Sequence, residues 1–423
     1  MKKYLFLIIG ILITLSNYAQ NIGINTTPAS PPTNTLDING TLRVRGGTPG
    51  TGKVLTSDAN GVGSWTTSSA NYPRISYDAI LALPSPTLGD MAFDITFRCL
   101  RVYNGNGWIC TYQNPGNFIP NMIAIASAGG TSDDVGLSTA VDGLGNVYIT
   151  GYFFGTTVFG ATSISSAGGN DIFVAKYNSV GTLQWVQSAS GTSTDVGYGI
   201  AVDGLGNVCI AGTYSNTATF GTTSITSAGS LDIFVVKYNS SGTLQWVQSA
   251  GGTSVDIGRG IAVDASGNLY VTGSYQGTAT FGATPKTSVG SDDIFVAKYN
   301  NSGTVQWMQS AGSTNSDNSN SIAVDGSGNV YITGYYQGTA TFGATLKTSA
   351  GSDDIFVAKY NGNGAFQWVQ SAGGTSEDRG NSIALDGSGN VYVTGYYLAT
   401  VIFGATPITS AGGLDIYVAR LDK

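Results

Sequence analysis

Carboxylates are the side chains of this sequence whose spacing could do chemistry, because the 423 residues include no histidine. Histidine is the commonest general base and the commonest transition-metal ligand in proteins, so a histidine-dependent triad and a histidine-ligated zinc site are excluded. Aspartates, by contrast, recur at intervals of 61 residues. Three sets do so: Asp134, Asp195, Asp256, Asp317 and Asp378; Asp142, Asp203, Asp264, Asp325 and Asp386; and Asp171, Asp232, Asp293, Asp354 and Asp415.

The fivefold repetition of these aspartates favours a structural role. An acid and a base need unequal environments, whereas a repeated unit gives every copy the same environment. We therefore expect the first set, from Asp134 to Asp378, to accept hydrogen bonds from backbone amides of nearby turns. Calcium is the alternative. The loop Asp203-Gly-Leu-Gly-Asn207 offers oxygen ligands, but it lacks the carboxylate density and the bidentate glutamate of an EF-hand. We predict no cofactor and no metal.

One carboxylate breaks the repetition. Glu377 is the only glutamate of the chain, and it is followed by Asp378 and Arg379. This asymmetry keeps an enzyme open as an alternative, namely one that acts on a polysaccharide with a carboxylate site at a central channel. We predict that the chain is not an enzyme, because no catalytic constellation accompanies Glu377.

Two rows of equivalent positions are candidates for binding a ligand. One row differs in type from copy to copy, which suits contact with a polar ligand: Leu137, Tyr198, Arg259, Asn320 and Asn381. The other row is aromatic and could stack on sugar rings: Phe153, Tyr214, Tyr275, Tyr336 and Tyr397. The alternative for the aromatic row is packing between units, and the alternative for the variable row is a lack of constraint.

Short strands must position these residues. In the second copy, residues 199–203, 207–212, 232–238 and 244–250 are rich in β-branched and aromatic residues and are bounded by Gly and Asn, which is typical of strands joined by tight turns. We predict one four-stranded antiparallel meander per unit. Because antiparallel strands alternate in direction, the variable row and the long connection after the second strand should share one face.

Tandem four-stranded units predict an all-β fold of the β-propeller type. Residues 122–128 match the fourth strand of a unit, and residues 415–420 match the third strand. We expect these two segments to pair, so that the N-terminal strand completes the last of five blades and closes the ring. Closure would also remove unpaired sheet edges. A linear β-solenoid is the competing arrangement.

The repeat resembles a known bacterial family. Asp256 to Gly273 reads Asp-Ile-Gly-Arg-Gly-Ile-Ala-Val-Asp-Ala-Ser-Gly-Asn-Leu-Tyr-Val-Thr-Gly, and Asp293-Ile-Phe-Val-Ala-Lys-Tyr-Asn is followed by Gly303-Thr-Val-Gln-Trp307. These motifs are similar to the SBBP β-propeller repeat and, in outline, to NHL-type blades. The resemblance covers about 300 residues in all five copies. It implies architecture and an extracytoplasmic setting, without a common reaction. The family is often drawn with seven blades, whereas five units are counted here.

Composition and charge exclude a further class of function. Charged residues make up 10% of the chain and the formal net charge is −7. A nucleic-acid phosphate backbone would be repelled by such a protein, so we predict no nucleic-acid partner.

The residues before the repeats divide into segments of different character. Residues 1–20 have two lysines and a short apolar run, which predicts a secretory signal peptide that is too short to span a bilayer. Residues 21–71 are predicted to be a stalk or linker with hairpins. They resemble the stalks of bacterial surface and tail-fibre-type proteins, which implies a homotrimer. Residues 114–121 are a linker before the propeller, residues 122–423.

Residues 72–113 are predicted to form a small β module. A turn at Asn104-Gly105 would set Cys99 opposite Cys110, and an oxidising compartment would favour a disulfide between them, although a shift in register would make the pair diagonal. Cys209 replaces a tyrosine of the other copies and is expected to be a packed core thiol.

The sequence as a whole predicts an exported, non-catalytic binding or scaffold protein. It would lie on the outer surface of a bacterium or be secreted, with the periplasm as an alternative. A protein or a glycan would be the partner, and no transmembrane segment is expected. A lectin with one sugar site per blade remains an alternative, as does the enzyme that uses Glu377.

Overall fold

The computed structural model describes residues 126–422 and, before them, the backbone of six strands. The chain divides into two units, Met1–Asn121 and Met122–Lys423. Within the described part of the chain, no helix has the length and the apolar character needed to cross a membrane.

The first unit contains two small sheets. β1 (Lys53–Ser57) pairs with β2 (Gly63–Thr67) as an antiparallel hairpin. The second sheet has the order β3-β4-β5-β6. Its strands are β3 (Arg74–Ile75), β4 (Met91–Asp94), β5 (Cys99–Tyr103) and β6 (Trp108–Gln113). The signal peptide, most of the stalk and the linker 114–121 lie outside the described residues.

The register of β5 and β6 differs from the expected one. Cys99 is opposite Gln113, and Cys110 is opposite Arg101, so the two cysteines are not direct cross-strand partners but lie on a diagonal, as the alternative register predicted. The prediction assumed a two-residue turn at Asn104-Gly105, whereas the paired strands end at Tyr103 and Trp108 and contain a bulge between Leu100 and Arg101. The disulfide therefore remains a prediction without support from this register.

The second unit consists of five successive antiparallel repeats. Repeat 1 contains β8 (Asp134–Val141), β9 (Val147–Phe153), β12 (Asp171–Tyr177) and β13 (Leu183–Gly191). Repeat 2 contains β14 (Val196–Val202), β15 (Val208–Phe220), β16 (Thr223–Tyr238) and β17 (Leu244–Gly252). Repeat 3 contains β18 (Asp256–Val263), β19 (Leu269–Phe281), β20 (Thr284–Tyr299) and β21 (Val305–Gly312). Repeat 4 contains β22 (Asn318–Val324), β23 (Val330–Tyr336), β26 (Asp354–Tyr360) and β27 (Phe366–Gly374). Repeat 5 contains β28 (Asp378–Leu385), β29 (Val391–Tyr397) and β32 (Asp415–Leu421).

The predicted meander is confirmed in repeats 1 to 4, where the first strand pairs with the second, the second with the third and the third with the fourth. The connection between the second and third strands, expected to be a long loop, contains a hairpin. It consists of β10 (Thr156–Phe159) and β11 (Thr162–Ser165) in repeat 1, β24 (Thr339–Phe342) and β25 (Thr345–Thr348) in repeat 4, and β30 (Thr400–Phe403) and β31 (Thr406–Thr409) in repeat 5. In repeats 2 and 3 the same hairpin is continuous with the neighbouring strands.

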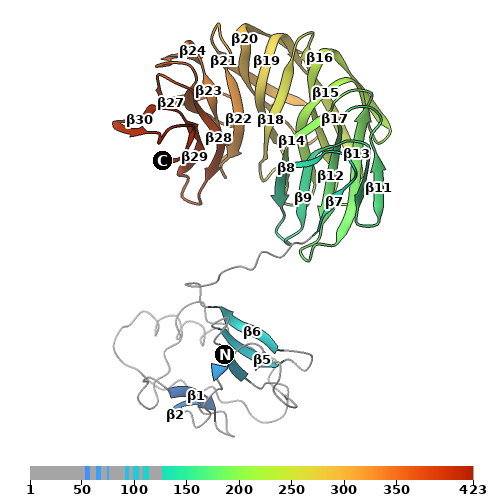
Figure 1. Ribbon diagram of the computed structural model, residues 1–423, viewed down its shortest axis with the longest axis vertical. Helices are drawn as coiled ribbons and strands as arrows, with labels where there is room; N and C mark the ends of the chain where they lie inside the picture. Colours follow the sequence, from blue (N-terminus) through green and yellow to red (C-terminus); the bar gives the residue numbers. More distant parts are fainter. Residues whose placement is uncertain are drawn as a thin grey trace, which may run out of the picture. The chain divides into compact units, whose positions relative to one another are not determined.

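The fourth strand of each complete repeat also reaches the next repeat. The end of β13 pairs with β15, the end of β17 with β19, and the end of β21 with β24. The repeats follow one another around an open arc, with the first strands on its inner side (Figure 1). The hydrophobic core lies between neighbouring repeats, as one cluster joins Cys209, Ile233 and Val235 of repeat 2 to Tyr275 and Phe281 of repeat 3.

The predicted closure of the ring is not present in this structure. β32 pairs with β29 and with no other strand of the described residues. The described end of the closing segment, β7 (Ala128–Gly129), pairs with β10 of repeat 1 in the register that Ala189 adopts against Phe220. One side of the expected junction is therefore formed and the other side is open. Residues 122–125 lie outside the described residues.

Candidate functional site

A β-bulge presents the variable row of residues at the inner side of the arc. In each repeat the register of the first strand shifts by one residue against the second strand. The extra residue is a member of the variable row in every repeat: Leu137, Tyr198, Arg259, Asn320 and Asn381. A bulge leaves its extra residue unpaired and redirects its side chain, so the five residues of the variable row share one backbone geometry.

Small residues on both sides of each bulge let the first strands approach closely. A Cβ on Gly199 would lie 2.9 Å from the carbonyl oxygen of Arg259, and a Cβ on Gly260 would lie 3.2 Å from Cα of Ser321. Asn320 donates a hydrogen bond from Nδ2 to the carbonyl oxygen of Gly380 at 2.9 Å. The pattern of a small residue, any residue and a second small residue in the sequence is the signal of this arrangement.

Two arginines lie in this region, and their surroundings differ. Arg379 donates a hydrogen bond from Nε to Asp353 Oδ2 at 2.6 Å and forms an ion pair with Glu377, whose Oε1 lies 2.9 Å from Nε. Its guanidinium lies 4.0 Å from the ring centre of Tyr335. Glu377 Oε1 also accepts from the hydroxyl of Tyr396 at 2.6 Å. Glu377 is therefore held by an ion pair and one hydrogen bond in a charged cluster. Sequence reasoning missed Asp353, because only the fold brings it to Arg379.

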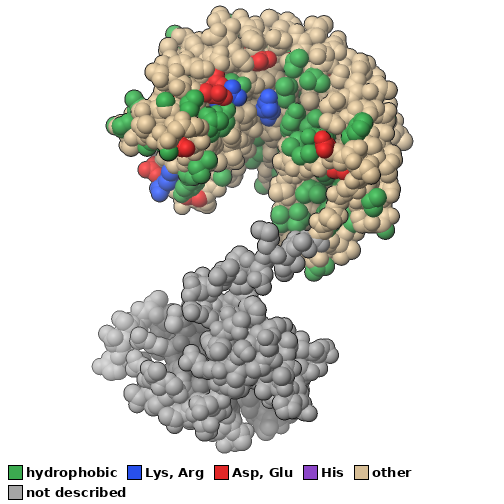
Figure 2. Space-filling view, in the orientation of Figure 1, with side chains coloured by type: hydrophobic (Ala, Val, Ile, Leu, Met, Phe, Trp, Pro, Cys, Tyr) green, Lys and Arg blue, Asp and Glu red, His purple; other side chains and the backbone are tan. Residues whose placement is uncertain are grey.

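Arg259 has no such partner. Its guanidinium lies 5.9 Å from the ring centre of Tyr198, and its Nε is enclosed without a hydrogen-bond acceptor. No carboxylate of residues 126–422 forms an ion pair with it. Figure 2 shows basic side chains on the inner face of the arc, both beside acidic side chains and apart from them.

The row of predicted aromatic contacts is buried. The exposed fraction is 0% for Tyr214, Tyr275 and Tyr336, and 7% for Tyr397. The hydroxyl of Tyr275 bonds Ser310 Oγ at 2.7 Å, and its ring packs edge-on against Phe281. These tyrosines belong to the core between repeats in this structure, so we leave them out of the candidate site.

The first set of aspartates holds the connections at the bulged end of each repeat. Asp256 Oδ2 accepts from the amide of Gly252 at 2.7 Å, and Asp256 Oδ1 accepts from the amide of Gln276 at 3.1 Å. Corresponding bonds to backbone amides are formed by Asp134, Asp195, Asp317 and Asp378. The carboxylate thus joins the turn before the first strand to the end of the second strand.

Each of these aspartates from Asp195 to Asp378 faces a second buried aspartate, and the two compete for one amide. Asp232 Oδ1 and Asp256 Oδ2 lie 2.8 and 2.9 Å from the position of a Cβ on Gly251. Because Gly252 donates to Asp256, Asp232 Oδ1 has no donor. In the pair of Asp171 and Asp195 the amide donates to the other aspartate. Gly191 donates to Asp171, and Asp195 Oδ2 has no donor. In each pair, one carboxylate oxygen therefore lacks a hydrogen-bond donor.

Burial makes these carboxylates weaker acids. It raises the pKa of Asp195 and of Asp317 to about 7, and the neighbouring charges of Asp171 and Asp293 add to the effect. Burial also raises the pKa of Asp256 to about 6, with a further contribution from Asp232. The shift follows from removing a charged form from water. Four such pairs should make the stability of the fold depend on pH, with the folded state favoured when these carboxylates are protonated.

The second set of aspartates closes the turn after the first strand. Asp203 Oδ1 accepts from the amides of Leu205 and Asn207, and Oδ2 accepts from Asn207 Nδ2. Burial opposes ionisation of Asp203, but these hydrogen bonds and that from Lys237 outweigh it and hold its pKa below the ordinary value. The donors already surround the carboxylate that was considered as a calcium ligand, which favours the turn-capping interpretation. Residues 126–422 contain no cluster of three or more potential metal ligands.

Cys209 changes this turn in repeat 2. In the other repeats a tyrosine hydroxyl donates to the turn aspartate, as Tyr270 does to Asp264 at 3.1 Å. Cys209 is buried and free, and Lys237 Nζ takes the place of the hydroxyl, 3.0 Å from Asp203 Oδ2. Lys298, by contrast, lies over the ring of Tyr270. The smaller side chain thus lets a lysine form a buried ion pair, which Cys209 in the sequence could have indicated.

The pairing, the period and the inter-repeat core define a tandem-repeat protein of the β-propeller type. A family model described as "SBBP: Beta-propeller repeat" matches residues 245–274, 306–335 and 367–396. These three segments thus match SBBP β-propeller repeats, as the motifs predicted.

Curated relatives cover part of the chain. An uncharacterized WD repeat-containing protein of Acanthamoeba polyphaga mimivirus is 27% identical over 263 residues, 51% of this chain and 19% of that protein. The regulatory protein FlaEY of Caulobacter vibrioides is 28% identical over 293 residues, 63% of this chain and 30% of that protein. The chain thus matches less than a third of either relative's length. A solved extracellular domain of a two-component system from B. thetaiotaomicron has 10% identity and a TM-score of 0.13, covering 84% of this chain and 57% of that one; this likeness carries no argument.

Proposed function

We propose that this chain is an exported, non-catalytic binding or scaffold protein of a bacterial cell envelope. The observation that carries the proposal is the contrast at the bulges: the backbone is the same in five repeats, while the side chain changes from Leu137 to Tyr198, Arg259, Asn320 and Asn381. A scaffold that holds different side chains in equal positions suits recognition of a partner without internal repetition. Relatives named as WD repeat-containing and as regulatory support binding as the activity.

The test compares the two ends of the strands. One variant replaces Tyr198, Arg259, Asn320 and Asn381 with alanine. Its control replaces Leu144 and Leu205, which are 82% and 80% exposed in the turns at the opposite end, with serine. We expect the first variant to lose a cross-linked envelope partner that the control retains. Loss in the control alone would place binding at the other end. Fractionation of producing cells tests the proposed export.

We also propose that the five repeats close into a ring in the folded protein, with the segment that ends at Gly129 as the fourth strand of repeat 5. The equivalents of Ile416 in repeats 1 to 4 are 0% to 3% exposed, and those of Val418 are 0% to 5% exposed, whereas Ile416 is 86% and Val418 is 77% exposed. Burying two such side chains stabilises a protein by roughly 3–6 kcal/mol. An uncovered apolar edge also invites association between molecules.

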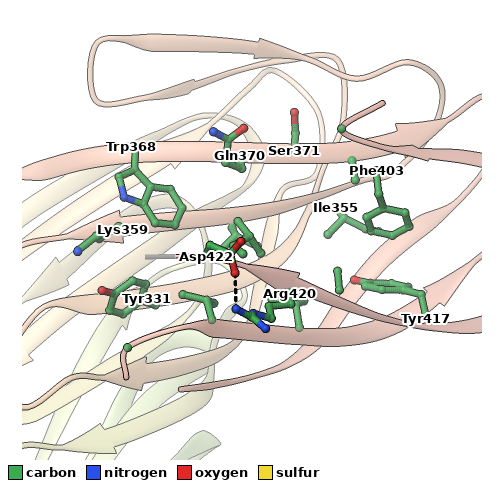
Figure 3. Close-up of a pocket in the computed structure, with 18 residues that line it drawn as sticks. Tyr331, Ile355, Lys359, Trp368, Gln370, Ser371, Phe403, Tyr417, Arg420 and Asp422 are labelled. Atoms are coloured by element: carbon green, nitrogen blue, oxygen red, sulfur yellow. Dashed lines mark ion pairs between the residues drawn. The ribbon is translucent and has the colours of Figure 1, made fainter. Parts of the chain in front are cut away.

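A cavity beside the open strand supports this proposal. It has a volume of about 690 Å³ and lies between repeats 4 and 5, where Trp368, Phe403 and Tyr417 line it (Figure 3). In repeat 3 the equivalent tryptophan, Trp307, packs 2.7 Å from the position of a Cβ on Gly364 and donates to the carbonyl oxygen of Gly362. Trp368, by contrast, lines the cavity.

Paired cysteines test closure. By the register of repeat 1, where Val174 is opposite Gln187, Ala126 should face Val418. We expect Ala126→Cys with Val418→Cys to form an intramolecular disulfide that a shift in mobility without reductant reveals. Ala126→Cys with Ile402→Cys is the control, because Ile402 is exposed but outside that register. A disulfide only between molecules, or none, would contradict the closed ring.

The lectin and the enzyme considered from the sequence each lack a supporting contact among the described residues. A lectin with one aromatic site per repeat would need exposed rings, whereas all five aromatic residues of that row, including Phe153, are buried in the core. An enzyme that uses Glu377 would need that carboxylate to leave Arg379 and Tyr396. Neither alternative is favoured by a specific contact of the described residues, so binding through the bulge row is the function we propose.

A further inference from the structure

We propose that Arg259 and Tyr198 form a binding site for an acidic sugar, in which the guanidinium pairs with a uronate carboxylate and the tyrosine ring lies against the pyranose. This inference rests on the proposed function, because it names the ligand class of the bulge row. The two residues are the extra residues of neighbouring bulges, and the guanidinium lies 5.9 Å from the ring centre of Tyr198.

The charge balance of the region carries the first step. Residues 126–422 contain three arginines. Arg379 is paired with Asp353 and Glu377, and Arg420 is paired with Asp422 at 2.7 Å. Arg259 has neither an ion-pair partner nor an acceptor for Nε. A partly enclosed positive charge without a partner is costly in free energy. A bound carboxylate would supply the ion-pair partner that the chain does not give to Arg259.

The nearby carboxylates are engaged elsewhere. Asp353 accepts from Arg379 and from Gln337, and Asp292 Oδ2 accepts from Ser316 Oγ at 2.8 Å. Glu377 is held by Arg379 and Tyr396. None of them turns to Arg259 in the structure. The charges of Asp292, Asp353 and Arg259 all act on Tyr335, so negative charge lies in the same region as Arg259. A ligand with one negative charge per residue therefore fits better than a densely phosphorylated one.

The shape of the two side chains selects a sugar acid. A guanidinium presents paired N–H donors in the plane that matches a carboxylate, and a tyrosine offers an apolar face with a polar tip. The next two members of the row are Asn320 and the exposed Asn381, whose amides suit hydroxyl groups. A pyranose that carries a carboxylate meets all three features.

Calorimetric titration with tri-galacturonate tests the site in the full chain. Maltotriose is the neutral sugar control, and tri-glutamate is the acidic control without a sugar. We expect heat of binding from tri-galacturonate alone. Arg259→Gln should weaken binding at least tenfold, whereas Arg420→Gln makes the same change of charge far from Tyr198 and should leave it unchanged. Arg259→Lys keeps the charge without the paired donors and should give an intermediate value.

Defined results overturn the inference. Equal binding of tri-glutamate would assign the site to a peptide, and equal binding of maltotriose would remove the role of the charge. Absence of tri-galacturonate binding, or binding that survives Arg259→Gln, rejects the sugar acid. If the four-residue alanine variant still loses its envelope partner in that event, the proposed function stands and only this ligand class fails.

Discussion

The buried core positions and the bulge positions of each repeat differ in how far their residue type is fixed. Tyr275 and its equivalents keep their type in repeats 2 to 5 and are buried, while Arg259 and its equivalents differ in every repeat but one and lie at the inner face. The difference teaches that the core between repeats fixes the backbone, so that one unpaired residue per repeat is free to vary. Four changes would break or sharpen this contrast.

The largest effect is expected at a repeated core position. Tyr275→Ala removes a buried ring between repeats 2 and 3, and such a truncation costs about 3–5 kcal/mol. The measurement is the midpoint of urea unfolding. Tyr275→Phe removes only the bond to Ser310 Oγ and should cost about 1 kcal/mol. A tolerated alanine would place Tyr275 among contacts with a ligand after all.

A smaller loss is expected at the one repeat whose turn departs from the others. Lys237→Met leaves Asp203 without its buried partner and should cost about 2–3 kcal/mol. In a Cys209→Tyr background the tyrosine hydroxyl can serve Asp203, as it does in repeat 3, so the same change should cost less than half as much. Equal losses in the double-mutant cycle would show that Lys237 and the hydroxyl are not interchangeable.

The paired aspartates predict a dependence of stability on pH. The folded pKa of Asp256 is about 6 and that of Asp195 is about 7, above the ordinary value of 3.8. The folded state therefore binds more protons than the unfolded state between these values, and stability should rise as pH falls from about 7 toward about 4.5. Below about 4, protonation of the second set, including Asp264, removes stability again.

Asp232→Asn tests the origin of that dependence. The new amide replaces Oδ1, the oxygen without a donor, and can donate to Asp256. We expect a gain of about 1 kcal/mol at pH 8 and little gain at pH 5. Ala228 still has an acceptor in the remaining oxygen, so the backbone is undisturbed. A loss of stability at pH 8 would mean that the two carboxylates do not lack a hydrogen-bond donor.

The smallest effect is expected at the bulge. Arg259→Gln should not lower the free energy of unfolding by more than about 0.5 kcal/mol, because the guanidinium forms no ion pair within residues 126–422 and its unpaired charge does not stabilise the fold. Thermal or urea unfolding beside the Tyr275 variants provides the scale. A loss as large as that of Tyr275→Phe would turn Arg259 into a residue of the scaffold.

Much of the repeat could be predicted from sequence, and the failures have physical causes. Strands such as 232–238 follow from β-branched residues between glycine turns, because period and propensity agree there. The hairpin at Thr156–Ser165 was missed, since its threonines and serines resemble a loop. The bulge was missed because a one-residue shift depends on pairing, although Gly258 and Gly260 mark it. Whether β32 gains a second partner strand could not be predicted, because that contact involves a segment almost 300 positions away along the chain, roughly the length of the repeats.

Pairing between successive repeats should protect backbone amide hydrogens from exchange with solvent to different degrees along the array. The hydrogen-bonded ladder continues from β13 into β15, from β17 into β19 and from β21 into β24. Every repeat in the middle is held by neighbours on two sides, whereas β32 is held by β29 alone. Amide hydrogens of repeat 3 should therefore exchange with solvent only in the rarest openings. Those of β32 should exchange first if the arc stays open, and should be protected like those of repeat 3 if the segment that ends at Gly129 closes the ring.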